Sequence, residues 1–313
     1  MKRFKNILLV CNFDAKQHMA EDRAVSLAKQ NNAQLTVFTV VKELSADART
    51  SFTLMPPQEL HSLVIDAYRD KVDALAADIS QQGVEVRSQV VTGTPFLEII
   101  RQVLRDKHDL VILAAEEKIG VNGRLFGTTS MHLMRKCPCP VWVVKRAQTR
   151  SYTRILAAVD PSIYDSRRWA INPLILQLAS GMARKEAGEL HIIHVWRLFG
   201  ERYVRSSGMT EEAVQEAKAL EKKQHKQRFD TLLNRAGVTD LKPHLHLIEG
   251  DPDDRIPEMV VEKGIDLLVM GTVCRTGIAG FLIGNTAGEV LNQVNCSVLT
   301  LKSEGFVTPV PLE

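Results

Sequence analysis

The sequence predicts an α/β protein made of two tandem, doubly wound domains, each with a parallel β-sheet between layers of helices. Three observations lead to this fold class. Segments of the first half recur in the second, as with Gly93 and Gly250, which lie 157 residues apart. Short apolar stretches that suit strands alternate with longer stretches of helical periodicity. Several strand candidates, such as Val111-Ile112-Leu113, are continuously apolar, which is typical of parallel strands buried on both faces.

The repeat covers nearly the whole chain and therefore divides it into domains. The same 157-residue spacing relates Asp109 to Asp266 and Gly127 to Gly284, whereas near the front Ile7 matches Ile155 at a spacing of 148. A period near 150 residues indicates tandem domains rather than a solenoid. We expect the domains at residues 1–147 and 152–304, a polar and basic linker between them, and a C-terminal tail at 305–313.

Strands and helices alternate in each copy. In the first copy we expect strands near 6–12, 34–41, 84–91, 109–114 and 140–145, and helices near 17–31, 57–82, 95–107 and 128–136. In the second copy we expect strands near 154–160, 189–196, 242–249, 265–271 and 297–302, and helices near 165–185, 210–236, 252–263 and 286–294. Gly93-Thr94-Pro95 and Gly250-Asp251-Pro252 fit strand exits into helices, with Thr or Asp as the N-cap and Pro at the first helical position.

Length, charge and cysteine content exclude several classes of protein. The chain has 313 residues and a net charge of +3, which gives no electrostatic case for binding nucleic acid or an anionic membrane. No run approaches the roughly 18 apolar residues of a membrane span, and the apolar run at the N-terminus is too short for a signal peptide. The five cysteines, without an export signal, favour reduced thiols in the cytoplasm.

The most informative stretch is GTVCRTGIAGFLIGNT, from Gly271 to Thr286. It joins the apolar run that ends at Met270 to a predicted helix, so unpaired backbone N–H groups at the helix start would face the loop and suit an anion. Thr286 and Glu289 have the spacing of a capping box, which predicts that Thr286 caps this helix. The loop lacks the GK[ST] ending of a P-loop and the GxGxxG pattern of a dinucleotide fold.

With these residues, the chain resembles the universal stress proteins, which hold ATP phosphates with a G-x2-G-x9-G-[S/T/N] loop after their fourth strand. Gly271, Cys274 and Gly284-Asn285 fall at that spacing, and Cys274 departs from the pattern because ATP-binding members usually have glycine there. The resemblance covers both copies and implies the adenine nucleotide alpha hydrolase-like fold, with a five-stranded parallel sheet in the order 3-2-1-4-5. In such a sheet the ligand lies where the strand order reverses, here between strands one and four.

The resemblance implies a nucleotide site in the second domain. Asp160, after the first strand of that domain, would contact the adenosine part, and Ala158, Val159 and Val195 would line the adenine slot. The remaining site residues would flank the ribose and phosphates: Met270, Gly271, Val273, Cys274, Arg275, Gly284, Asn285 and Thr286. Taken alone, Asp160-Pro161-Ser162 is also an ordinary turn signal. Cys274 would weaken ATP binding or favour AMP or ADP, and a redox-sensitive thiol is an alternative to an inert one.

The first domain differs at the matching positions. Asn12 replaces Asp160, Ala114 replaces Gly271, and Glu116 and Glu117 replace Val273 and Cys274. A like-charge contact at 4 Å costs about 4 kcal/mol at an effective dielectric near 20. We therefore predict that the first domain does not bind ATP.

The sequence gives weaker evidence for a metal site or a catalytic site than for a nucleotide site. His191 and His194 are three apart on a predicted strand and point to opposite faces, and His244 and His246 share a face but have no Cys or acid at ligand spacing. We therefore interpret them as ordinary strand histidines and predict no metal site. No nucleophile lies beside a base in a known motif, so no catalytic residue is assigned.

The leading hypothesis is a cytoplasmic tandem universal stress protein that binds ATP, with AMP, ADP and accompanying Mg²⁺ as further candidates. It would act in bacterial stress adaptation by binding or signalling, with at most weak ATPase activity. The alternatives are a slow ATP hydrolase or adenylyl-transferring enzyme, and an interaction module without nucleotide. The family resemblance also implies pairing of the last strands, near 140–145 and 297–302, as an intrachain pseudo-dimer, with a homodimer as a further alternative.

Overall fold

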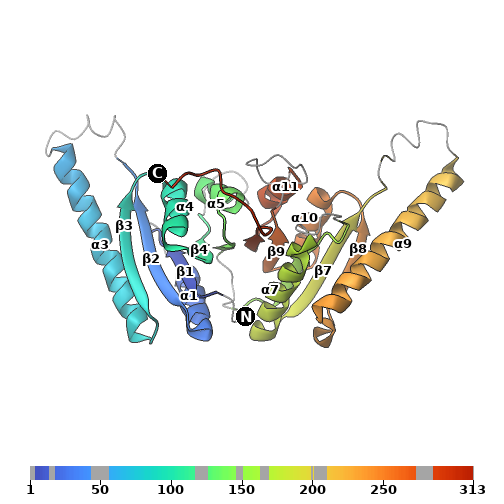
Figure 1. The fold of residues 1–313 in the computed structure, drawn as a ribbon, viewed down its shortest axis with the longest axis horizontal. Coiled ribbons are helices and arrows are strands. Elements are labelled where there is room, and N and C mark those ends of the chain that lie inside the picture. Colours follow the sequence, from blue (N-terminus) through green and yellow to red (C-terminus); the bar gives the residue numbers. More distant parts are fainter. Residues whose placement is uncertain are drawn as a thin grey trace. The chain divides into compact units, whose positions relative to one another are not determined.

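The computed structural model describes residues 4–13, 18–43, 56–116, 126–145, 151–162, 169–198, 200, 210–272 and 285–312. These residues form two compact units. Residues 4–145 and 306–312 belong to the first unit, and residues within 151–305 belong to the second. Figure 1 shows parallel strands with helices packed against them in each unit.

The first unit contains a parallel sheet in the order β3-β2-β1-β4-β5. Its strands are β1 (Asn6–Val10), β2 (Gln34–Val41), β3 (Val86–Thr92), β4 (Leu110–Ala114) and β5 (Val141–Val144). Its helices are α1 (His18–Asn31), α3 (Pro57–Gln81), α4 (Pro95–Asp106) and α5 (Thr128–Lys136). Right-handed crossovers place α1 and α3 on one face of the sheet and α4 and α5 on the other.

The second unit repeats this order as β8-β7-β6-β9-β10. Its strands are β6 (Arg154–Ala158), β7 (Glu189–Trp196), β8 (His244–Glu249), β9 (Leu267–Gly271) and β10 (Ser297–Leu301). Its helices are α7 (Ile171–Glu186), α9 (Glu211–Ala236), α10 (Pro252–Glu262) and α11 (Asn285–Gln293), with a short 3-10 helix, η1 (Thr239–Leu241), between α9 and β8. The predicted order 3-2-1-4-5 is confirmed in both units.

Burial explains why the central strands are continuously apolar. In β1, Ile7, Leu8 and Leu9 are completely buried, and in β9 the same holds for Leu267, Leu268 and Val269. Burying one such side chain contributes about 1.5–3 kcal/mol, so these strands form the core of each unit. The edge strands β3 and β8 are partly exposed and more polar, which fits a strand that has a neighbour on only one side.

The strand exits before α4 and α10 have the same geometry in both units. Gly93 and Gly250 adopt φ values of 140° and 141°, which favour glycine, and their N–H groups donate to Val41 and Trp196 carbonyls at 3.0 Å. A proline then begins each helix, as predicted. The preceding Thr94 and Asp251 occupy the N-cap positions, but neither side chain bonds to its helix; Asp251 pairs with Arg197 instead.

Two boundary predictions are wrong. Helix α11 begins at Asn285, so Thr286 lies inside its first turn and is not the cap; the preceding Gly284 is outside the described residues. Strands β1 and β6 end at Val10 and Ala158, two residues earlier than expected. Within the described ranges, only one further N–H group on each segment, that of Cys11 and that of Val159, still donates to the neighbouring strand. Among the described residues, no helix is long and apolar enough to cross a membrane.

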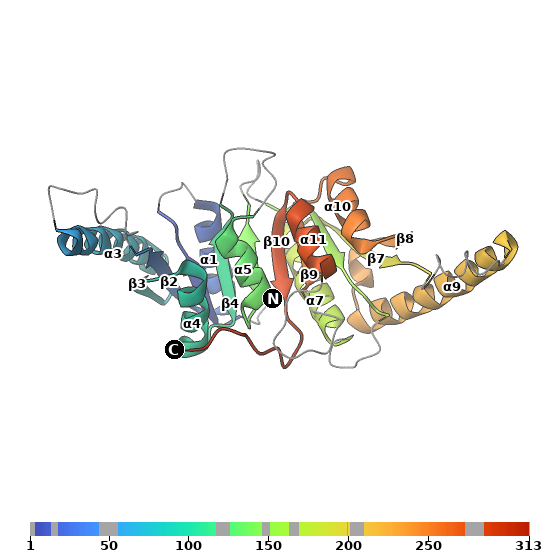
Figure 2. The same ribbon diagram turned by 90° about the horizontal axis from the view of Figure 1, so that it is seen from above.

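The C-terminal segment from Phe306 belongs to the first unit, although it follows the last strand of the second. Figure 2 shows this dark red segment running along α4. Val310 is buried, and the Arg101 guanidinium of α4 donates to the Pro311 carbonyl at 3.5 Å. The tail therefore completes the packing of the first unit.

Candidate functional site

The second unit has its topological switch point at the carboxyl ends of β6 and β9. The two strands are hydrogen-bonded neighbours, and Ala158 opposite Met270 is the last pair between them. Because β7 follows β6 on one side and β10 follows β9 on the other, the connections diverge here and leave the edge open to a ligand. The predicted meeting of the two strand ends is confirmed.

Asp160 is held in place by a buried side chain of α7. The Asn172 amide is 1% exposed, accepts from the Asp160 N–H at 2.9 Å and donates to the Asp160 carbonyl at 2.9 Å. The Asp160 carboxylate in turn accepts from the Ser162 N–H at 3.2 Å and from the Ser162 hydroxyl. The turn interpretation of Asp160-Pro161-Ser162 is therefore confirmed, and the turn fixes the acid at the mouth of the switch point.

The apolar residues predicted for the adenine slot differ in exposure. Val159 and Met270 are buried in the core of the second unit. Ala158 and Val195 are half-buried, so they keep surface that a ligand could contact. Ala158 and Val195 therefore remain candidates for the adenine contact, whereas Val159 and Met270 are covered by the core.

Gly271 has a packing reason for lacking a side chain. A Cβ at this position would lie 2.8 Å from Cδ1 of Ile171, the first residue of α7. Carbon atoms approach no closer than about 3.5 Å without repulsion, so a larger residue here would force the end of the Ile171 side chain to shift. The glycine therefore lets Ile171 of α7 pack against the end of β9 without that shift.

Lys302 is a functional candidate that the sequence reasoning missed. Its ammonium group donates to the Thr272 hydroxyl at 2.6 Å, directly after β9. Thr272 is 2% exposed, and its N–H donates to the Leu301 carbonyl at 3.0 Å. A cation is thereby fixed beside the predicted phosphate loop. The signal in the sequence was that Lys302 directly follows the last strand of the domain. In the predicted order, that strand lies next to strand four, which ends just before Thr272.

The phosphate loop itself is outside the described residues. This applies to Val273, Cys274, Arg275 and Gly284, and to the side chain of Asn285. Asn285 and Thr286 lie in the first turn of α11, where backbone N–H groups have no partner within the helix. The assigned contacts of these residues stay predictions.

The first unit carries an acid at the equivalent helix start. Gly127 is the N-cap of α5, and a Cβ there would overlap the carboxylate of Glu116. The Glu116 carboxylate therefore rests against the backbone of the helix N-terminus, where the helix dipole favours a negative charge. The position that would receive a phosphate in the second unit is covered by the chain's own carboxylate in the first.

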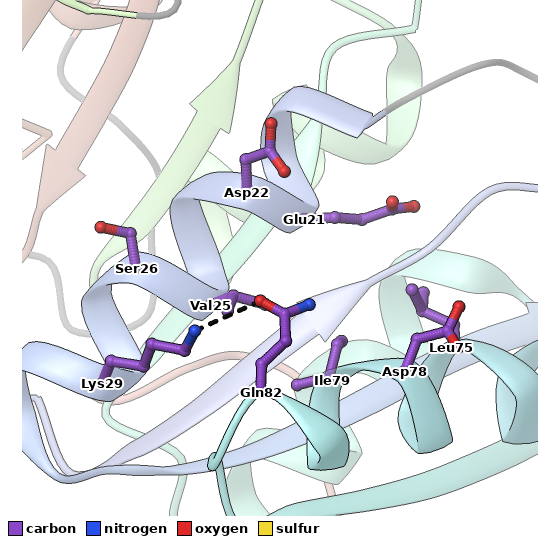
Figure 3. Close-up of a pocket in the computed structure, with 9 residues that line it drawn as sticks. All are labelled: Glu21, Asp22, Val25, Ser26, Lys29, Leu75, Asp78, Ile79 and Gln82. Atoms are coloured by element: carbon purple, nitrogen blue, oxygen red, sulfur yellow. Dashed lines mark hydrogen bonds between the residues drawn. The ribbon is translucent and has the colours of Figure 1, made fainter.

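A cavity of about 400 Å³ lies in the first unit, away from either switch point. Figure 3 shows the residues of α1 and α3 that line it, with the Lys29 ammonium donating to the Gln82 side chain at 3.3 Å. Three carboxylates also line it: Glu21, Asp22 and Asp78. Since these would repel phosphates, the cavity does not suit a nucleotide.

His191 and His194 lie on opposite faces of β7, as the strand periodicity predicts. On one face of β7, His194 Nε2 lies 2.7 Å from His225 Nδ1 of α9. On the other face, His191 Nδ1 lies 3.1 Å from His246 Nε2 of β8. The expectation that no acid lies at ligand spacing from these histidines is wrong, however. Glu189 lies close enough to His191 and His244 for the three side chains to hold one metal ion. Glu189 is two residues before His191 on the same face, and that spacing was the available signal.

Comparison with known proteins identifies the family. Residues 3–145 and 151–302 both match the Universal stress protein family, and the chain belongs to that family. Universal stress protein E of Photorhabdus laumondii is 25% identical over 99% of this chain and 98% of its own length. Universal stress protein E of Escherichia coli K12 is 26% identical over 100% of this chain and 98% of its own. The predicted tandem organisation and the resemblance to universal stress protein E are confirmed.

Solved structures agree with the fold. The protein PA1789 from Pseudomonas aeruginosa superposes with a TM-score of 0.72 at 24% identity, covering 97% of this chain and 95% of that one. A putative universal stress protein from another strain of the same species has a TM-score of 0.73 at 23% identity, with the same coverage. At these identities the likeness establishes the fold of both units.

Proposed function

We propose that this tandem universal stress protein binds an adenine nucleotide in its second unit and acts in stress adaptation by binding rather than by turnover. The observation that carries the proposal is the pairing of β6 with β9, which brings the fixed Asp160 turn to the same sheet edge as the predicted phosphate loop. ATP is the leading ligand, with AMP and ADP as alternatives. The cytoplasmic location and the pairing of the last strands predicted from the resemblance belong to the same proposal.

The described residues fit the two ends of such a ligand. The Asp160 carboxylate can accept hydrogen bonds from ribose hydroxyls or the adenine amino group. At the other end, the Lys302 ammonium and the start of α11 offer positive charge and N–H donors to phosphates. Mg²⁺ would accompany ATP through the phosphate oxygens.

The first unit is proposed as a partner domain without nucleotide. Glu116 covers the start of α5, and Asn12 stands where the second unit has Asp160. The lysine that matches Lys302 in the repeat, Lys145, packs its ammonium over the Phe126 ring at 5.4 Å from the centroid. All three differences disfavour a bound phosphate, so one nucleotide per chain is expected.

The test is calorimetric titration of the full chain with ATP, ADP and AMP, with and without Mg²⁺, beside an assay for released ADP. Lys302→Gln is expected to weaken ATP binding by about tenfold, because a hydrogen bond to a charged group contributes about 1.5 kcal/mol or more. Lys145→Gln is the matched control and should leave the affinity unchanged. Equal effects of the two substitutions, or two nucleotides per chain, would refute the assignment to the second unit.

Hydrolysis is an outcome of the same experiment. Rapid release of ADP would favour the alternative that the protein is an ATP hydrolase. Failure of all three nucleotides to bind would favour the interaction module.

A further inference from the structure

A second group of polar side chains lies at the β7–β8 edge of the second unit, away from the carboxyl ends of the strands. His191 of β7 is opposite His244 of β8 in the sheet, and their rings stack with centroids 4.7 Å apart. Glu189 precedes His191 on the same face of β7. One ligand atom from each of these three residues lies within 4.8 Å of the other two.

His191 is the buried member and has an unsatisfied nitrogen. Its side chain is 6% exposed, and Nε2 is buried without a hydrogen-bond partner. The nearest acidic oxygen, Glu189 Oε2, is 3.7 Å away, which is too long for a hydrogen bond. A buried polar atom without a partner costs about 1–3 kcal/mol, so its presence calls for a ligand at this position.

His246 fixes the orientation of the His191 ring. Its Nε2 lies 3.1 Å from His191 Nδ1, and the two rings are stacked with an interplanar angle of 6°. If His191 Nδ1–H donates to His246, then Nε2 carries a lone pair that faces the Glu189 carboxylate. Two electron-rich atoms in that position repel each other unless a cation lies between them. Metal-bound histidines are commonly oriented by such a hydrogen bond from the second ring nitrogen.

Arg154 competes with a metal ion for the Glu189 carboxylate but is held weakly, and nearby Lys263 is engaged by another acid. The Arg154 guanidinium lies 3.5 Å from Glu189 Oε2, with both side chains about half exposed. Such surface pairs contribute about 0–1 kcal/mol, so a metal ion can displace the arginine. Lys263 is paired with Glu262 at 2.7 Å.

From this geometry we propose that Glu189, His191 and His244 form a binding site for a divalent transition-metal ion, with His246 as a positioning residue. Imidazole and carboxylate donors suit Zn²⁺, whereas Mg²⁺ and Ca²⁺ prefer oxygen donors alone. Three protein ligands leave a fourth position of a tetrahedral ion for water or another ligand. The site is separate from the proposed nucleotide site and does not depend on it.

The test is a Zn²⁺ titration of the full chain without a polyhistidine tag, in competition with a chromophoric chelator, and a parallel titration with Co²⁺ followed by visible absorption. One Zn²⁺ per chain and a tetrahedral Co²⁺ spectrum are expected. His244→Gln and Glu189→Gln, which change exposed residues and should preserve the fold, are expected to remove the spectrum or weaken binding by more than tenfold. His246→Gln should weaken binding by about 10–100-fold, as loss of a positioning partner does.

His132→Gln in the first unit is the matched control and should leave Zn²⁺ binding unchanged. Absence of Zn²⁺ binding in the unaltered chain would overturn the proposal. So would unchanged affinity in both His244→Gln and Glu189→Gln, because the metal would then be held elsewhere, for example by cysteines. Circular dichroism of each variant separates loss of the ligand from loss of the fold.

Discussion

The carboxyl ends of β1 and β4 in the first unit and of β6 and β9 in the second are the same place in a repeated fold, yet they are built differently. In the second unit, Asn172 clamps the turn at Asp160, and Gly271 ends β9 beside Ile171 of α7. In the first, Ala114 stands at the position that matches Gly271, and Glu116 rests on the start of α5. Duplication preserved the sheets, while the switch points diverged in a few polar residues.

The difference teaches where ligand binding is specified in this fold. Strand order and core packing are shared by both units and so cannot decide which unit binds. Under the proposed function, the deciding features are the Glu116 carboxylate at the helix start in one unit, and the Asp160 turn and the Lys302 ammonium group in the other. The comparison can be tested with substitutions at three positions of the second unit and with the pH dependence of stability.

The largest effect is expected from Gly284→Asp, which places in the second unit an acid comparable to Glu116 in the first. A like charge about 4 Å from a phosphate costs about 4 kcal/mol at an effective dielectric near 20, or roughly a thousandfold in affinity. Calorimetric titration with ATP measures the loss. Unaltered affinity in a folded variant would show that the loop before α11 does not hold the phosphates.

Asn172→Ala removes the clamp on the Asp160 turn. It takes away two hydrogen bonds at a buried site, so the free energy of unfolding should fall by about 2–3 kcal/mol. Chemical denaturation measures this change, and nucleotide affinity should fall as well. If stability drops while affinity does not, the position of Asp160 is irrelevant to the ligand.

Gly271→Ala makes the end of β9 like the end of β4, where Ala114 occupies the matching position. The added Cβ would press on Ile171 at 2.8 Å, and overpacking of this kind costs about 1–2 kcal/mol. The reciprocal change, Ala114→Gly, should cost about 0.5–1 kcal/mol through backbone entropy alone. Comparable unfolding curves for Gly271→Ala and the unaltered chain would contradict the packing role given to this glycine.

The smallest effect is a pH dependence shared by the two units. Burial lowers the pKa of His108 and His132 in the first unit and of His191 and His246 in the second. The unfolded chain then binds more protons than the folded chain below the ordinary histidine pKa of 6.5. Stability should therefore be constant above about pH 6.5, fall as the pH drops below it, and level off below the folded pKa values.

Denaturation curves at several pH values check this expectation. In the His246→Gln variant, stability should depend less on pH than it does in the unaltered chain. Its neighbours His191, His244, Lys263 and Glu262 act on the same ring, so the variant reports on the whole group. A stability that rises on acidification would contradict the lowered pKa values.

Much of the fold could be predicted because the repeat supplied each element twice. The matching glycines Gly93 and Gly250 located the same strand exit in both units, and continuous apolar runs identified the central strands. Predicted helix boundaries were wrong where local signals compete. Thr286 and Glu289 have the spacing of a capping box, yet helix α11 already begins at Asn285, one residue before Thr286.

Site residues could be predicted only where they belong to a short pattern of neighbouring residues in the sequence. The turn at Asp160 and the acid at Glu116 stand in such patterns. Asn172 does not, because one polar residue in an apolar helix has no visible partner until the fold brings it to Asp160. The group of Glu189, His191 and His244 likewise depends on the pairing register of β7 with β8, which composition does not reveal.

The return of the C-terminal segment to the first unit has a consequence for synthesis of the chain. The residues from Phe306 onward leave the ribosome after the second domain, yet Val310 is buried in the domain that emerges before it. The first domain can collapse early but gains its final packing only after the second domain has been synthesised. A fragment truncated after the first domain would therefore lack part of its own interior and should be less stable than the same domain in the intact chain.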